Sequence, residues 1–281
     1  MKVRKASGEY QPFDREKFET SLRNSGVSET TTLRMSKQAS QMEGVLKSTD
    51  TIYDFARREL AKSDQPSAMR YSLRRALIEL GPTGYPFERY VARLLERQGY
   101  DCQVGVYVRG FCVSHEVDVL ATRKGEVNVF ECKFHNRKGY KTGVKTALYV
   151  KARFDDIEKG YHTDDNPDRQ APKKKIHQSW LVTNTKHTTE AVKYAECSGV
   201  KLVSWSYPAG NSLLEWIEKT DQYPITVLFH LDKSMKSKLL RLNTVTLEDL
   251  LSFTAWNSCS RAEQRVIAKL KDQARLLLPN A

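Results

Sequence analysis

The segment His115-Glu-Val-Asp-Val-Leu-Ala121 is followed, after the turn Arg123-Lys-Gly-Glu126, by Val127-Asn-Val-Phe-Glu-Cys-Lys-Phe134. Both segments alternate apolar and polar residues, and a tight turn with a glycine joins them, which predicts a β-hairpin. Side chains two residues apart on a strand share a face. We therefore expect the apolar side chains to enter a core and the charged side chains to gather on the opposite face.

The charged face of this hairpin has the residue types that metal-assisted phosphodiester hydrolysis requires. On the second strand, Glu131 and Lys133 should share one face, opposite Phe130, Cys132 and Phe134. On the first strand, the expected arrangement is Glu116 and Asp118 on one face and Val117 and Val119 on the other. Two carboxylates bind a hard cation, the cation polarises a phosphate and lowers the pKa of a bound water, and a lysine orients that water or stabilises the developing charge.

This order of an acid, a β-turn and then Glu-x-Lys flanked by apolar residues resembles the PD-(D/E)xK nuclease superfamily. Residues 84–216 look most like its Mrr-type restriction endonucleases. The resemblance implies that Asp118 and Glu131 are metal ligands, that Lys133 is the catalytic lysine and that Glu88 is a further acid. Val117 stands where the superfamily name has a proline, which the superfamily can dispense with.

The alternatives to a catalytic site are ordinary surface interactions. Exposed strands often alternate opposite charges for solubility. Glu88 equally fits a solvated carboxylate that pairs with Arg89 or another neighbour. The two histidines beside the hairpin, His115 and His135, are expected to be structural, with satisfied hydrogen bonds.

The segments around the hairpin predict an α/β fold, α+β overall, with parallel strands in a mixed sheet. Strands that alternate with helices are typical of such sheets. The expected elements are a helix over 85–98 that contains Glu88, a helix over 142–159, a strand over 176–183, a helix over 188–198 and a strand over 200–205.

The first eighty residues form a second unit. A short hairpin is predicted around Ser7-Gly8, and helices are predicted over 15–24, 31–46, 50–61 and 67–80, with Asp14 as the first N-cap and the third helix capped near Thr49. The hairpin sequence Val-x-Lys-x-x-Gly and the following Pro-Phe-Asp-x-x-Lys resemble an ATP-cone, the nucleotide-sensing module at the front of ribonucleotide reductases and their repressors.

The ATP-cone resemblance implies a nucleotide-binding site in this unit. Lys5 and Lys17 could converge on a triphosphate, and Thr49 could hydrogen-bond the adenine edge; Val3 and Gln11 are the other positions carried over. The family commonly has Lys-Arg-Asp-Gly where this chain has Lys5-Ala-Ser-Gly8, so one phosphate contact is missing. A unit that has lost nucleotide binding and serves only for assembly is the alternative.

These observations divide the chain into an ATP-cone at 1–80, a linker at 81–84, a nuclease domain at 85–220 and a C-terminal segment at 221–281 for packing or oligomerisation. In the C-terminal segment, a strand over 225–231 and helices over 247–253 and 260–278 are expected. Ile267, Leu270 and Ala274 form the apolar stripe of the last helix.

The overall charge suggests a polyanionic partner. Among the 281 residues, 46 Lys and Arg against 34 Asp and Glu give a net charge of +12. Such an excess favours phosphate contacts with DNA. The basic residues lie soon after the catalytic strand, at Arg137, Lys138, Lys141, Lys145, Lys151 and Arg153, and again at Lys173, Lys174 and Lys175.

No apolar run approaches a membrane span, and the N-terminus lacks the apolar core of a signal peptide. The five cysteines contain no Cys-x-x-Cys pair, which predicts reduced thiols and a cytoplasmic protein.

The sequence therefore predicts a metal-dependent endodeoxyribonuclease that uses Mg²⁺ or Mn²⁺ and binds double-stranded DNA, acting in restriction or defence against foreign DNA. ATP or dATP would regulate it through the N-terminal unit, with assembly into a dimer or tetramer. The principal alternative is a catalytically silent, nucleotide-regulated DNA-binding protein. The intact set Asp118, Glu131 and Lys133 counts against that alternative, but a ribonuclease or a nickase would use the same site.

Overall fold

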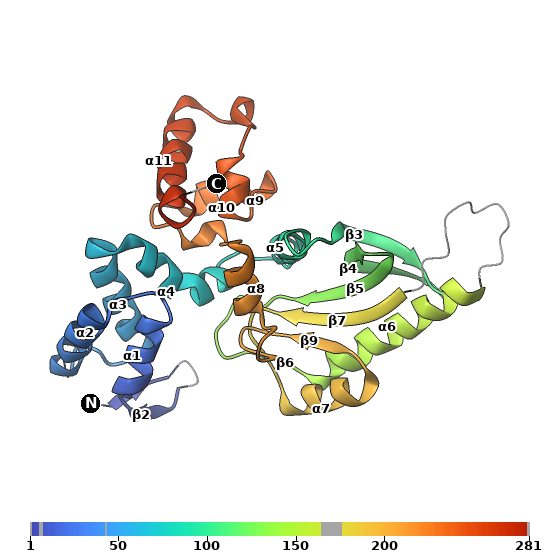
Figure 1. Cartoon of the computed structure of the whole chain (residues 1–281), viewed down its shortest axis with the longest axis horizontal. Coiled ribbons are helices and arrows are strands. Elements are labelled where there is room, and N and C mark those ends of the chain that lie inside the picture. Colours follow the sequence, from blue (N-terminus) through green and yellow to red (C-terminus); the bar gives the residue numbers. More distant parts are fainter. Residues whose placement is uncertain (1, 6–7, 43, 164–175, 280–281) are drawn as a thin grey trace.

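The protein is described by a computed structural model that covers residues 2–5, 8–42, 44–163 and 176–279. Three groups of elements lie around the helices α4 and α5 in Figure 1. The N-terminal helices lie on one side, the central sheet lies on the other, and the C-terminal helices lie above the junction of the two. The central sheet carries the hairpin that the sequence singled out.

The N-terminal unit contains a hairpin and helices, as predicted. Strands β1 and β2 are antiparallel, with Val3 opposite Gln11. The elements are β1 (Lys2–Arg4), β2 (Tyr10–Pro12), α1 (Arg15–Arg23), α2 (Glu29–Gln41), α3 (Thr49–Ser63) and α4 (Gln65–Ile78). Asp14 caps α1 as expected. Helix α2 stops at Gln41, short of the predicted end at residue 46, and Ser48 caps α3.

The central unit is built on a mixed sheet with strand order β3-β4-β5-β7-β9. Strands β3, β4 and β5 are antiparallel neighbours, whereas β7 and β9 run parallel to β5. The strands are β3 (Asp101–Arg109), β4 (Ser114–Arg123), β5 (Glu126–Lys133), β7 (Ile176–Thr183) and β9 (Lys201–Val203). The mixed α/β fold class is confirmed, and β3 is a strand that the sequence analysis did not identify.

Helices cover both faces of this sheet (Figure 1). Helices α5 and α8 pack against one face, where the buried side chains include Phe87, Phe130 and Trp216. Helices α6 and α7 pack against the other face. The remaining elements of this unit are α5 (Tyr85–Glu96), β6 (Lys141–Thr142), α6 (Val144–Thr163), β8 (Lys186–His187), α7 (Thr189–Ser198) and α8 (Leu213–Thr220).

The C-terminal segment packs on helices α4 and α5. The Thr226 hydroxyl donates to the Ala76 carbonyl of α4 at 2.7 Å, and the Tyr90 hydroxyl of α5 donates to the Gln222 carbonyl at 2.6 Å. The elements are η1 (Ile225–Val227), α9 (Lys233–Arg241), α10 (Leu247–Leu251), η2 (Trp256–Ser258) and α11 (Arg261–Leu277).

The predicted strand over 225–231 is wrong, and α9 was not predicted. Ile225 and Val227 are fully buried, but they belong to a single 3₁₀ turn that follows Pro224. A short apolar run cannot be assigned to a strand or to another buried segment by periodicity alone. The stripe of α11 is confirmed, since Ile267, Leu270 and Ala274 are buried. Among the helices of the described residues, none combines the length and the hydropathy needed to cross a membrane.

Candidate active site

Strands β4 and β5 pair over only part of their length and then separate. Their ladder runs from Arg123 opposite Glu126 to Val119 opposite Phe130. Beyond that point, β4 continues to pair with β3 as far as Ser114, and β5 continues to pair with β7 up to Lys133. We call this opening between residues 114–118 of β4 and 131–133 of β5 the fork.

Asp118 lies where the two strands separate. Its carboxylate oxygen accepts a hydrogen bond from the Cys132 backbone N–H at 2.7 Å. A side chain therefore takes the place of a backbone carbonyl just where the β4–β5 ladder ends. Since backbone donors must find partners when buried, this bond both ends the ladder and fixes the carboxylate at the fork.

The predicted alternation of β4 is wrong at Asp118. Val117 packs in the cluster on the α6 face, whereas Val119 packs in the cluster on the α5 face, although both were expected on one face. The neighbouring strand changes face at the same level, between Val104 and Val106, where Gly105 has a φ of +64°. Glycine adopts this conformation at little cost, so β3 can follow the irregularity of β4.

The fork brings the predicted acidic residues within electrostatic reach of one another. Burial, together with Asp118, Glu116 and Glu131, raises the pKa of Glu88 to about 7. Burial and the negative charge of Asp118 likewise raise the pKa of Glu131 to about 7. Burial also raises the pKa of Asp118. Carboxylates that raise one another's pKa in a partly buried site are typical of functional sites, because the fold gains no stability from crowding them.

Helix α5 places Glu88 at the fork. Glu88 lies in the first turn of α5. The Phe87 ring packs against the Phe134 ring, which follows β5, at a centroid distance of 5.9 Å. A Cβ atom at Gly84 would come within 3.2 Å of the Glu88 carboxylate, so the helix start lies close beneath that group. The structure thus supports Glu88 as part of the acidic cluster, and its predicted alternative partner Arg89 does not cause its pKa shift.

Lys133 stands at the exposed end of β5. The Thr183 hydroxyl of β7 donates to the Lys133 carbonyl at 2.7 Å, which fixes the end of the strand. The side chain is exposed, and its positive charge lowers the pKa of both Asp118 and Glu131. The charge of Lys133 therefore acts on both carboxylates.

Arg153 of α6 is a functional candidate that the sequence analysis counted only among the basic residues for DNA. Its guanidinium donates to the Glu131 carboxylate and to the Tyr149 hydroxyl, and its carbon lies 4.5 Å from the centre of the Tyr149 ring. The i, i+4 spacing of Tyr149 and Arg153 was visible in the sequence. Their position over β5 was not, because it depends on how α6 crosses the sheet.

The donor set of the fork suits a hard cation with few protein ligands. Within the described residues, no group of three or more His, Cys, Asp or Glu side chains is arranged to hold a metal ion. Mg²⁺ is commonly bound through one or two carboxylates and completes its shell with water and phosphate oxygens. Asp118 and Glu131 supply oxygen donors of this kind. A cation between them would offset the burial that raises both pKa values and the charge of Asp118 that further raises the pKa of Glu131.

The histidines beside the hairpin have structural partners, as predicted. The His115 ring lies 2.7 Å from the Asp156 carboxylate. The backbone N–H of His135 donates to the Asn184 side-chain oxygen, and the Asn184 amide donates to the His135 carbonyl. The His135 ring lies 3.0 Å from the Thr142 hydroxyl. All five cysteines are free thiols in this structure, and Cys132 is buried.

Half of the basic residues proposed for DNA contact in the segment 137–153 are paired with acids. Lys138 pairs with Asp50 of α3, Lys151 pairs with Asp155, and Arg153 pairs with Glu131. Arg137, Lys141 and Lys145 are exposed. The run Lys173, Lys174 and Lys175 lies outside the described residues.

The nucleotide-site residues predicted in the N-terminal unit lie in different environments. Val3 is buried in the core of this unit, at 2% exposure. The Lys5 ammonium lies 3.7 Å from the Glu9 carboxylate, and the Lys17 ammonium lies 2.9 Å from the Asp14 carboxylate. Gln11 is half-buried opposite Val3, and Thr49 is exposed at the start of α3. In the described part of the chain, no hydrogen bond or ion pair joins these side chains to one another.

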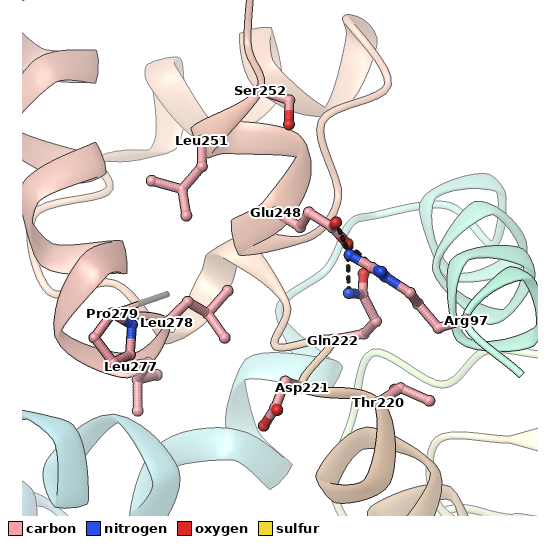
Figure 2. Close-up of a pocket in the computed structure, with 10 residues that line it drawn as sticks. All are labelled: Arg97, Thr220, Asp221, Gln222, Glu248, Leu251, Ser252, Leu277, Leu278 and Pro279. Atoms are coloured by element: carbon pink, nitrogen blue, oxygen red, sulfur yellow. Dashed lines mark hydrogen bonds and ion pairs between the residues drawn. The ribbon is translucent and has the colours of Figure 1, made fainter. Parts of the chain in front are cut away.

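A cavity of 380 Å³ lies away from the fork, where α5, α8, α10 and the end of α11 meet. Figure 2 shows that its polar side is an internal network. The Arg97 guanidinium donates to the Glu248 carboxylate at 2.9 Å, and the Gln222 amide donates to the same group at 2.6 Å. These polar groups satisfy one another's hydrogen bonds. The cavity therefore reads as a packing interface between segments of the chain.

Comparison with known proteins relates most of the chain to a protein without an assigned function. An uncharacterized protein of Archaeoglobus fulgidus is 43% identical over 162 residues, which span 58% of this chain and 84% of that protein. The chain belongs to the same family as this Archaeoglobus protein. No model of a known protein family matches the sequence.

A solved structure supports the fold. The crystal structure of the protein of unknown function AF1548 superposes with a TM-score of 0.57 at 37% sequence identity, and the match covers 70% of this chain and 100% of that chain.

Part of the chain is also similar to an enzyme that acts on DNA. The crossover junction endodeoxyribonuclease Hjc of Methanocaldococcus jannaschii is 40% identical over 76 residues. That match spans 27% of this chain and 45% of the relative, so the chain corresponds to less than half of that enzyme.

Proposed function

We propose that the protein is a magnesium-dependent endodeoxyribonuclease whose catalytic centre is the fork. The observation that carries the proposal is the convergence of Glu88, Asp118 and Glu131, from a helix and two separating strands, beside Lys133. The fold gains no stability from gathering these carboxylates, whereas binding a divalent cation would benefit from them. The sequence similarity to an endodeoxyribonuclease supports DNA as the substrate.

Each residue of the fork has a chemical role in this proposal. Asp118 and Glu131 would hold the cation, which would supply a Lewis acid and lower the pKa of a bound water. Lys133 orients the attacking water or stabilises the charge that develops on the phosphate. Glu88, whose pKa is about 7, can take up or release a proton near neutral pH.

The N-terminal unit is proposed to regulate cleavage by binding ATP or dATP. Its hairpin and helices α1 to α4 match the elements expected of an ATP-cone, and Lys138, which follows the catalytic strand, contacts Asp50 of this unit. That contact supports a connection between the N-terminal unit and the segment that follows β5. A role in restriction or defence against foreign DNA, and action as a homo-oligomer, complete the proposal.

The direct test is incubation of the full-length protein with supercoiled plasmid and Mg²⁺, with EDTA as the control. We expect nicked and linear DNA only when Mg²⁺ is present. Tight DNA binding without any cleavage, over a range of divalent cations, would contradict the proposal and favour the silent DNA-binding protein.

A further inference from the structure

Arg153 is a largely buried cation in direct contact with a proposed metal ligand. Its side chain is 13% exposed, and that of Glu131 is 17% exposed. The guanidinium lies between the Glu131 carboxylate and the Tyr149 ring. A charge pair in such a position is sensitive to any other cation that approaches the carboxylate, because burial weakens solvent screening.

The bonds of Arg153 leave part of its donor capacity unused. One terminal nitrogen donates to Glu131 and the other donates to the Tyr149 hydroxyl. The Nε–H group is buried and has no hydrogen-bond partner among the described residues. A guanidinium presents its five N–H donors in a planar fork that matches carboxylate or phosphate with paired hydrogen bonds. The observed contacts therefore leave the Nε–H donor of Arg153 without an acceptor among the described residues.

A cation bound by Glu131 would compete with Arg153 for the same carboxylate oxygens. The released guanidinium would then be a buried charge without its partner, which is unfavourable. A DNA phosphate at the fork would restore a partner of the same geometry. The exposed Tyr149 ring, at 52% exposure, borders this position on the solvent side.

We propose that Arg153 is the phosphate-binding residue of the fork, and that it exchanges Glu131 for the scissile phosphate when a divalent cation binds. This inference rests on the proposed nuclease function and adds a substrate-binding residue to it. Its consequence is positive coupling: the metal ion frees Arg153 for DNA, and DNA removes the competitor of the metal ion. Such coupling must be equal in both directions.

A purely positioning role for Arg153 predicts the opposite effect on metal binding. If Arg153 only held Glu131 in the correct orientation, its removal would weaken metal binding. If Arg153 competes with the metal ion, its removal strengthens metal binding in the absence of DNA and weakens DNA binding in its presence. The sign of the change in metal affinity therefore separates the two roles.

The test uses Arg153→Met and Arg153→Lys in the full-length protein. Arg93→Met is the matched control, because Arg93 also pairs with carboxylates, those of Glu96 and Asp249, but lies away from the fork. Calorimetric titration with Mn²⁺ measures metal affinity. Fluorescence anisotropy of a labelled duplex, with EDTA or with Ca²⁺, measures the gain in DNA affinity that the metal ion produces.

We expect Arg153→Met to bind Mn²⁺ several-fold more tightly than the wild type and to lose most of the Ca²⁺-dependent gain in DNA affinity. Arg153→Lys keeps the positive charge and so guards against a folding defect. It should bind Mn²⁺ about as tightly as the wild type and lose part of the Ca²⁺-dependent gain in DNA affinity. Arg93→Met should change neither quantity. Unchanged or weaker Mn²⁺ binding by Arg153→Met, or a full gain in DNA affinity in both Arg153 variants, would overturn the inference.

Failure of this inference is distinguishable from failure of the proposed function. Wild-type protein that cleaves plasmid with Mg²⁺, combined with unchanged coupling in the Arg153 variants, would leave the nuclease proposal intact and remove Arg153 from it. Wild-type protein that neither binds Mn²⁺ nor cleaves DNA would remove both.

Discussion

The fork and the N-terminal unit carry the two predicted sites, and they differ in how their charged residues are arranged. At the fork, residues from α5, β4, β5 and α6 meet in a partly buried position. Burial, together with neighbouring carboxylates, raises the pKa of Glu88 and of Glu131 there. In the N-terminal unit, Lys5 and Lys17 each pair with an acid close in sequence. Buried charges of the same sign destabilise the fold, so their presence indicates a functional site. Surface charges that are neutralised by a neighbour in sequence are also common in proteins without such a site.

The largest expected effect concerns the chemistry of the fork. Asp118→Ala, Glu131→Ala and Lys133→Ala should each lower the rate of plasmid cleavage by several orders of magnitude, because each removes a metal ligand or a group that stabilises the transition state. Circular dichroism should show an intact fold. Lys124→Ala, in the exposed turn at the other end of the same hairpin, is the matched control and should cleave normally. Cleavage at the wild-type rate by the Lys133 variant would remove the fork from the chemistry.

Nucleotide binding tests the N-terminal unit. ATP or dATP should change the sedimentation profile and the cleavage rate together, since a nucleotide acts only by binding one assembly state more tightly than another. Lys5→Ala and Lys17→Ala should abolish both responses and leave basal cleavage unchanged. Arg15→Ala, which removes an exposed ion pair with Glu19 on the same helix as Lys17, is the control. Calorimetry without detectable nucleotide binding at millimolar concentration would show that the unit has lost this function.

The third prediction concerns DNA binding by Lys173, Lys174 and Lys175. Replacement of all three by alanine should weaken binding to unrelated duplexes to a similar extent, because phosphate contacts carry no sequence information. The slope of log affinity against log salt should become less steep by up to roughly three units. Anisotropy titrations at several salt concentrations measure this slope. An unchanged slope would show that these lysines do not contact phosphate.

The smallest expected effect is on stability and follows from Glu88. Its pKa is raised to about 7 in the folded protein from an ordinary value of 4.5. Between these values the folded state binds more protons than the unfolded state. The contribution of protonated Glu88 to the free energy of unfolding is therefore complete below about pH 4.5. It is lost as the pH rises through about 7.

Glu88→Gln removes this titration. In EDTA, the variant should melt a few degrees above the wild type at about pH 8, where wild-type Glu88 is ionised, and close to it at about pH 5. Glu126→Gln, at the exposed start of β5, should show no such dependence on pH. Calorimetric melting curves at the two pH values measure the difference. A Glu88 variant less stable than the wild type at about pH 8 would contradict the crowding of charge at the fork.

Several features of the fold were predictable because they are local. Alternation identified β4 and β5, and β7 has the predicted bounds Ile176–Thr183. The helices of the N-terminal unit followed from apolar spacing and capping residues such as Asp14. The alternation Cys102, Val104, Val106 and Val108 was also available in the sequence and would have identified β3.

The features that the sequence did not reveal depend on contacts between distant elements. The change of face at Asp118 coincides with its bond to the Cys132 backbone and with the positive φ of Gly105 on the neighbouring strand β3. The contact of Arg153 with Glu131 requires that α6 cross the sheet where Glu131 lies on β5. Periodicity along one segment carries no information on either arrangement.

We propose that the fork holds the catalytic metal ion. A crystal structure of the whole 281-residue chain grown with Mn²⁺, with anomalous data, would show whether it does. We predict an anomalous peak between the carboxylates of Asp118 and Glu131, with the Arg153 guanidinium withdrawn from Glu131. Absence of Mn²⁺ from the fork at saturating concentration, or its binding at another place in the molecule, would contradict the account.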